Sequence, residues 1–112
     1  MRHRDKVTLK KILVAIDEAI EAFDDASKET LLTNKLLKLA MAMSVIRVGE
    51  LVKALTSEFR RENPQVPWRE IAGYRDVAAH KYETLDFNRV YVTITEEFPE
   101  LKSQIEKILM EV

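Results

Sequence analysis

The sequence predicts an all-α protein, an up-and-down bundle of about four to five helices. Among its 112 residues there are only two glycines and three prolines, so few turns can interrupt regular structure. Apolar residues recur at three- and four-residue spacing over long stretches, which is the pattern of helices with one buried face. The length suits a single domain that spans residues 1–112.

The first expected helix follows Asp5, whose carboxylate can accept hydrogen bonds from the free N–H groups of a first helical turn. Its apolar positions follow the i, i+3, i+4 rule, with charged residues between them. These apolar positions are Leu9, Ile12, Leu13, Ile16, Ile20 and Phe23. The polar stretch 24–28 is the expected first loop.

A second, longer helix is predicted from about Thr30 to Arg61, a stretch without proline. Its apolar positions form an unusually wide stripe, which favours packing on two sides, either by the rest of the bundle or by a second copy of the chain. The stripe includes Leu32, Leu36, Leu39, Met43, Ile46, Leu51, Leu55 and Phe59. Gly49 costs about 1 kcal/mol relative to alanine in a helix. A close helix crossing is one explanation for it, and a tolerated imperfection is the other.

Prolines 64 and 67 end that pattern, and Pro67 suits the first turn of a third helix that leads into Arg75. Thr84 or Asp86 can cap the next helix. The run 90–95 is rich in β-branched residues, but a lone strand would leave its backbone groups unpaired, so we predict helix there. Pro99 is expected to open a last helix.

Composition excludes several classes of function. The formal net charge is −1, so any contact with nucleic acid must come from a local basic patch. Without cysteine there is no disulfide, thiol nucleophile or thiolate metal site. Neither a signal peptide nor a membrane-spanning stretch is expected, which favours the cytoplasm. The sequence has no Gly-rich phosphate loop and no His-Glu-x-x-His pair, and we expect neither a metal nor a cofactor.

The remaining candidate for chemistry is the segment 75–82. Arg75 carries a planar, permanently charged guanidinium suited to phosphate oxygens. His80 has a reference pKa of about 6.5, which suits proton transfer near neutral pH. An imidazole that takes the proton of a 2′-hydroxyl, together with a guanidinium that stabilises the phosphate, is sufficient for RNA cleavage without a metal.

Helical geometry restricts this hypothesis. Residues five apart lie about 140° apart around a helix, so Arg75 and His80 point in different directions unless the helix ends between them or two copies of the chain share the site. Asp76 and His80 are four apart, so the carboxylate can orient the imidazole. Arg75 and Tyr82 share a face if the helix is unbroken. Ordinary surface charges and a half-buried His80 and Tyr82 are the structural alternative.

The pattern Arg75-x4-His80-x-Tyr82 resembles the signature of HEPN domains, specifically the HepT-like ribonuclease toxins. Further matching features lie along nearly the whole chain. They are Gly49-Glu50, Pro67-Trp68-x-x-Ile71-x-Gly73, Leu85-Asp86 and Phe98-Pro99-x-Leu101. The resemblance implies a helical bundle that forms a homodimer, with the two motif copies meeting in a cleft between the subunits.

The resemblance also implies metal-independent RNA cleavage with Arg75 and His80 as the catalytic pair. The implied partner is a minimal nucleotidyltransferase antitoxin that adds AMP to Tyr82 and silences the toxin, since added bulk and negative charge repel RNA. Asp76 stands where the family often has asparagine, and Ala78 where it often has a larger apolar residue. An acidic neighbour favours protonated His80 but opposes an approaching phosphate. The alternatives are a non-catalytic, nucleotidyltransferase-associated substrate-binding subunit and a purely structural dimeric bundle.

Overall fold

A computed structural model describes residues 1–111, and every regular element in that range is helical. The predicted all-α class is therefore confirmed. The elements are α1 (His3–Phe23), α2 (Lys28–Thr33), α3 (Lys35–Lys53), α4 (Ser57–Glu62), α5 (Trp68–His80), the 3₁₀ turn η1 (Tyr82–Thr84), α6 (Phe87–Val92), the π-helical turn η2 (Thr93–Glu97) and α7 (Phe98–Met110). None of the helices in this range combines the length and apolar composition needed to cross a membrane.

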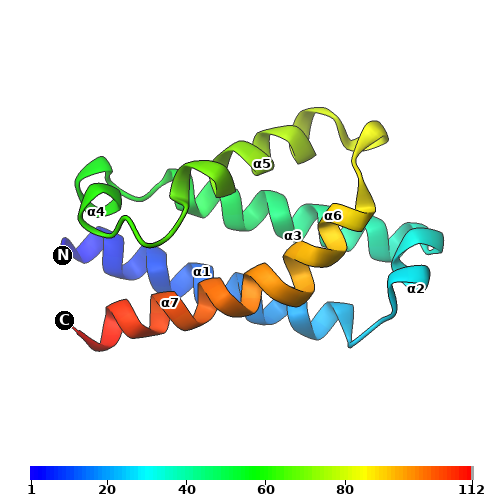
Figure 1. Cartoon of the computed structure of the whole chain (residues 1–112). Coiled ribbons are helices and arrows are strands. Elements are labelled where there is room, and N and C mark those ends of the chain that lie inside the picture. The colour runs from blue at the N-terminus through cyan, green and yellow to red at the C-terminus, as the bar shows by residue number, and fades with distance from the viewer. Residues whose placement is uncertain (112) are drawn as a thin grey trace.

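Four long helical segments form an elongated bundle (Figure 1), with α2 and α4 in the connections between them. They are α1, α3, α5 and the continuous segment α6–η2–α7. Helix α3 is central, because it packs against both α1 and α5, while α7 packs against α1. The two ends of the chain lie at the same end of the bundle, and α2 lies at the other.

The start of α1 differs from the prediction. The helix begins at His3, and Asp5 lies within its first turn instead of capping it. Asp5 is only 1% exposed, and its carboxylate accepts hydrogen bonds from the backbone N–H of Thr56 (2.9 Å) and from the Thr56 hydroxyl (2.7 Å). The prediction was wrong because the strongest donors for this carboxylate lie 51 residues away in the sequence.

The long helix predicted for residues 30–61 is divided into α2, α3 and α4. Asn34 has an extended backbone, and its side-chain oxygen accepts from the N–H of Leu37 (3.0 Å), which starts α3. Thr56 starts α4 in the same way, by accepting from the N–H of Phe59 (3.1 Å). Side chains of this kind compete with the helical backbone for hydrogen bonds, so no proline or glycine is needed at either break.

The C-terminal third confirms the prediction that residues 90–95 are helical. Asp86 caps α6 by accepting from the N–H of Asn88 (2.9 Å), and this bond lowers the pKa of Asp86. Pro99 lies in the first turn of α7, although that helix continues directly from η2 without a loop. The hydroxyls of Thr93 and Thr95 donate to the carbonyls four residues earlier, which satisfies them within the helix.

Helix α3 has two apolar faces. One lies in the core of the bundle and includes Met41, Val45, Val48 and Val52. On the other, Leu36 is 79% exposed and Met43 is 61% exposed, with Leu39 between them. The wide stripe predicted for this helix is therefore half covered within one chain, and its outer half is uncovered.

Candidate functional site

Helix α5 carries both residues of the predicted catalytic pair and is uninterrupted from Trp68 to His80. Its start is anchored to α4 and the connection after it. The Trp68 indole N–H donates to the carbonyl of Asn63 (2.9 Å), and the Trp68 and Phe59 rings lie 5.7 Å apart. Because the helix does not end between Arg75 and His80, the two side chains leave it in different directions.

Arg75 lies in the seam between α5 and α3, directly over Gly49. A Cβ atom at Gly49 would overlap the Cβ of Arg75 and lie 2.7 Å from its Cγ. Only glycine therefore leaves room for the Arg75 side chain at this crossing, which favours the close-crossing explanation of Gly49. The side chain of Arg75 is 21% exposed, so its guanidinium group reaches the surface beside α3.

Two carboxylates hold this guanidinium. One terminal nitrogen of Arg75 lies 2.8 Å from Glu50, and the other donates to Asp76 at 2.9 Å. Lys53 donates to the same oxygen of Asp76 at 3.3 Å. Hydrogen bonds from Arg75 and then Lys53 lower the pKa of Asp76, so this carboxylate is charged at neutral pH. A phosphate that binds Arg75 must compete with Glu50 and Asp76.

His80 is exposed on the outer side of α5. Its Nδ1 lies 3.0 Å from the backbone carbonyl of Asp76. A carbonyl oxygen only accepts hydrogen bonds, so Nδ1 carries the proton. The Nε2 lone pair of the neutral ring then has no hydrogen-bond donor among residues 1–111. The Asp76 carboxylate, by contrast, is hydrogen-bonded to Arg75 and Lys53 and makes no hydrogen bond to His80 in the described part of the chain.

Tyr82 lies in the turn η1, after α5 has ended at His80. The shared face with Arg75 that a continuous helix would create is therefore absent. The ring of Tyr82 is partly buried and packs edge-on against the ring of Phe87 at 5.8 Å. Lys38 of α3 lies over the same Phe87 ring, 5.2 Å from its centre. These contacts fix the position of the turn next to His80.

Glu50 and Lys53 are the site residues that sequence reasoning did not assign. They are three residues apart on α3, so they lie on one face of that helix. Glu50 forms an ion pair with Arg75, and Lys53 forms one with Asp76. The only signal in the sequence was the Gly49-Glu50 pair. Among residues 1–111, no three His, Asp or Glu side chains come together as a metal ion would require.

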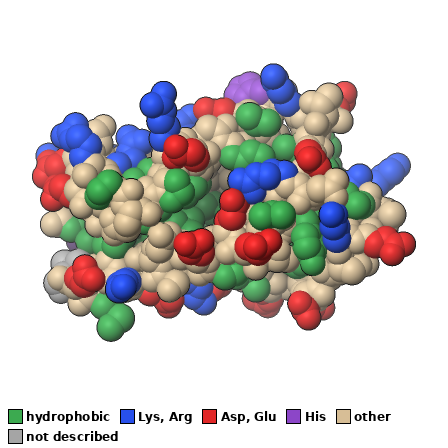
Figure 2. All heavy atoms as spheres, viewed as in Figure 1, with side chains coloured by type: hydrophobic (Ala, Val, Ile, Leu, Met, Phe, Trp, Pro, Cys, Tyr) green, Lys and Arg blue, Asp and Glu red, His purple; other side chains and the backbone are tan. Residues whose placement is uncertain are grey.

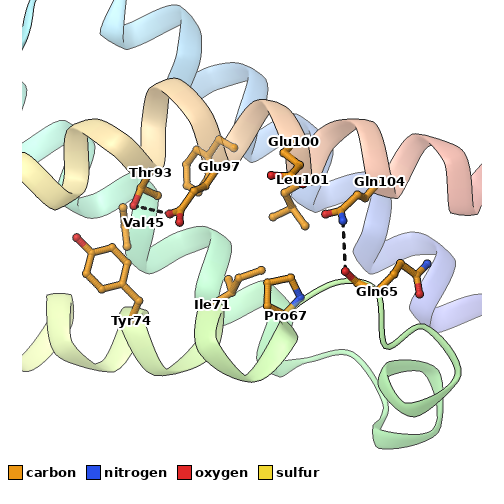
Figure 3. A pocket seen from close by; sticks show the side chains of 11 residues that line it. Val45, Gln65, Pro67, Ile71, Tyr74, Thr93, Glu97, Glu100, Leu101 and Gln104 are labelled. Carbon is orange, nitrogen blue, oxygen red and sulfur yellow. Dashed lines mark hydrogen bonds between the residues drawn. The ribbon is translucent and has the colours of Figure 1, made fainter.

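A separate cavity of about 170 Å³ lies between α5 and α7 (Figure 3). Val45 of α3 lines it together with Ile71 and Tyr74 of α5, and a hydrogen bond from Gln104 to the carbonyl of Gln65 (3.3 Å) crosses one side. Burial raises the pKa of Tyr74, so its hydroxyl stays protonated. None of the four predicted site residues lines this cavity.

A family model described as "Ribonuclease HepT-like" matches residues 12–108. A protein of Caldanaerobacter subterraneus subsp. tengcongensis named "Putative RNase" is 38% identical over 101 residues, which is 90% of each chain. One of Methanocaldococcus jannaschii with the same description is 36% identical over 110 residues, 97% of this chain and 95% of the relative. The "Probable ribonuclease HepT" of Thermococcus cleftensis is 34% identical over 103 residues, 88% and 94% of the two chains. No solved structure matches the chain.

Proposed function

The chain belongs to the HepT-like ribonuclease family, and on that basis we propose that it is an endoribonuclease that cleaves RNA without a metal ion. We further propose that it acts in the cytoplasm as the toxin of a toxin–antitoxin pair. The observation that carries the proposal is the family match over residues 12–108, supported by three relatives named as ribonucleases that align with at least 88% of the chain.

His80 is the general base in the proposed mechanism. Its free Nε2 takes the proton of a ribose 2′-hydroxyl, because Nδ1 already donates to the carbonyl of Asp76. The 2′ oxygen then bonds to the adjacent phosphorus while the bond from phosphorus to the 5′ oxygen breaks. The leaving 5′ oxygen takes up a proton from the imidazolium. Arg75 stabilises the negative charge that builds up on the phosphate oxygens.

Asp76 has a positioning role in this mechanism. Its backbone carbonyl fixes the tautomer of His80, and its carboxylate orients Arg75.

The proposed mechanism selects RNA over DNA, because DNA has no 2′-hydroxyl.

A homodimer is the proposed active unit. In one chain, Arg75 and His80 lie on different faces of an unbroken helix, so a second copy is the remaining way to place an arginine and an imidazole on one phosphate. The exposed outer face of α3, with Leu36, Leu39 and Met43, is the apolar surface that such a dimer would cover.

Tyr82 is the proposed control point. A minimal nucleotidyltransferase antitoxin would transfer AMP to its hydroxyl. Tyr82 lies in the turn just beyond His80, so the added phosphate would place a negative charge beside the RNA path and repel the substrate.

The variant His80→Ala tests the proposal. Wild-type protein expressed without its partner is expected to arrest growth and to degrade RNA in the presence of a chelator, and His80→Ala is expected to do neither. If wild type and His80→Ala are equally harmless and equally inactive on RNA, the ribonuclease proposal is wrong. Partner binding that survives in both would then favour the non-catalytic, nucleotidyltransferase-associated subunit.

A further inference from the structure

Three arginines line an open cleft of about 690 Å³ at the opposite end of α5 from His80. Arg60 and Arg61 come from α4, and Arg69 comes from the first turn of α5. Basic side chains gather over α4 and the connection to α5 at the upper left of Figure 2. The cleft is thus a local basic patch on a chain whose net charge is only −1.

The cleft is held rigidly before anything binds. Asp5 anchors the start of α4 through its two hydrogen bonds with Thr56. The Phe59 ring of α4 packs against the Trp68 ring of α5, and the Trp68 N–H donates to the carbonyl of Asn63. The backbones that carry the three arginines are therefore fixed relative to one another, which lowers the entropic cost of binding a ligand.

The charges of these arginines have no counterpart in the described residues 1–111. In that range, Arg60, Arg61 and Arg69 form no ion pair and donate no side-chain hydrogen bond. Each of the other five arginines does one or the other. Those five are Arg2, Arg4, Arg47, Arg75 and Arg89.

Arg60 adds a sharper sign of a missing acceptor. Its Nε is buried and has no hydrogen-bond partner in the described part of the chain, and an unsatisfied buried donor of this kind costs free energy until an acceptor arrives. Glu70 is the one carboxylate among the lining residues, so the cleft keeps an excess of positive charge and favours an anion.

The position of the cleft indicates which kind of anion it binds. Arg69 and His80 are eleven residues apart on the unbroken helix α5, which places them within about 20° of each other around its axis and about 16 Å apart along it. Both are exposed. A chain of phosphates that passes His80 can follow this face of α5 to the arginines.

We propose that the cleft of Arg60, Arg61 and Arg69 is a phosphate-binding subsite that holds the RNA backbone on one side of the cleavage point. This inference rests on the proposed ribonuclease function. The arginines contact phosphates and not base edges, so the subsite contributes affinity that is independent of RNA sequence and sensitive to salt.

The binding test uses full-length protein with His80→Ala, which removes cleavage, and a fluorescent 20-nucleotide single-stranded RNA between 50 and 200 mM salt. Adding Arg61→Gln and Arg69→Gln is expected to weaken binding at least tenfold at low salt and to reduce the slope of log K against log salt by about 1.4, since each lost phosphate contact removes about 0.7. The charge-matched control, Lys6→Gln with Lys10→Gln on α1, is expected to keep most of the affinity and slope. Replacing the same arginines by lysine is expected to restore most of the slope.

Cleavage measurements separate this inference from the proposed function. In the otherwise wild-type protein, the two Arg→Gln changes are expected to raise KM for the 20-nucleotide RNA with little change in kcat. They are expected to raise KM for a dinucleotide much less, because a dinucleotide is too short to reach the cleft. A wild-type protein that cleaves no RNA would overturn the proposed function. The subsite is overturned if the variant with Arg61→Gln and Arg69→Gln has the same salt slope as the control with Lys6→Gln and Lys10→Gln. It is also overturned by an absence of RNA binding, or if the Arg→Gln changes weaken only the binding of a protein partner.

Discussion

Gly49 leaves no room for a side chain beneath Arg75, because an added Cβ would overlap the Cβ of Arg75. The absence of a side chain at Gly49 allows Arg75 to cross α3 and reach Glu50. A residue with no chemistry of its own thus decides where the guanidinium group lies. Glycine destabilises the interior of α3, but at this position its lack of a side chain gives Arg75 of α5 the room it needs.

The variant Gly49→Ala is expected to lower the free energy of unfolding by about 1–2 kcal/mol. Overpacking costs about 1–3 kcal/mol, and the better helix propensity of alanine returns up to about 1 kcal/mol. RNA cleavage should fall further than stability accounts for, because Arg75 is displaced. Urea unfolding and cleavage assays on folded protein measure the two effects.

Gly73 supplies the stability control, since an added Cβ there meets nothing within 4 Å. Gly73→Ala on the same helix as Arg75 should raise the free energy of unfolding by about 0.5–1 kcal/mol. Equal effects of the two substitutions would show that Gly49 is not a packing requirement.

At the scale of elements, α4 is a short helix of six residues that could not persist alone in water. Its position depends on one buried carboxylate from α1, that of Asp5, which accepts from the Thr56 N–H and hydroxyl. Thr56 in turn caps α4 through Phe59. This chain of bonds links the N-terminal helix to the helix that carries Arg60 and Arg61.

The variant Asp5→Ala is expected to destabilise the protein by about 2–3 kcal/mol, because two donors lose their acceptor in a buried position. Amide hydrogen exchange should show the largest loss of protection in α4 and less in α3. Asp17→Ala, which removes an exposed pair with Lys102 at 2.7 Å, should change stability little. A similar small effect of Asp5→Ala would mean that α4 is held by its aromatic contacts alone.

At the scale of the whole molecule, the uncovered face of α3 is the feature that one chain does not explain. Leu36 and Met43 stand on the surface, outside the buried core of the bundle. Contiguous apolar surface of this kind marks an interaction site. The proposed homodimer would cover it and would bring two copies of the Arg75–His80 helix into one assembly.

Met43→Lys should shift the protein from dimer to monomer, with a dissociation constant at least tenfold higher, because a charge would be buried in an apolar interface. Sedimentation velocity over a concentration series measures the shift. Met110→Lys is the matched control: Met110 is 85% exposed at the end of α7, and its replacement should leave the dimer intact. A wild-type protein that sediments as a monomer throughout the series would refute the dimer.

Much of the fold could be predicted from local patterns. Helical periodicity indicated the all-α class and the helical state of residues 90–95 despite their β propensity. Capping chemistry offered Thr84 or Asp86 for the start of α6, and the structure uses Asp86. The breaks of the helix at Asn34 and Thr56 could not be predicted. The side chains of these residues compete with the helical backbone for hydrogen bonds, and the free-energy difference between a break and a continuous helix is small, so tertiary packing decides between the two.

The candidate site divides in the same way. Sequence alone determined the all-helical class and the two-sided apolar character of α3, and it led to the hypothesis that segment 75–82 carries the chemistry, because periodicity and residue chemistry are local properties. Only the tertiary structure decided that Arg75 is held by Glu50 over Gly49 and that the Asp5 carboxylate accepts hydrogen bonds from Thr56. It also decided that Arg60 and Arg61 of α4 line one cleft with Arg69 of α5. These contacts depend on how helices distant in sequence pack against one another. The relative positions of the helices are set by the close packing of side chains throughout the core.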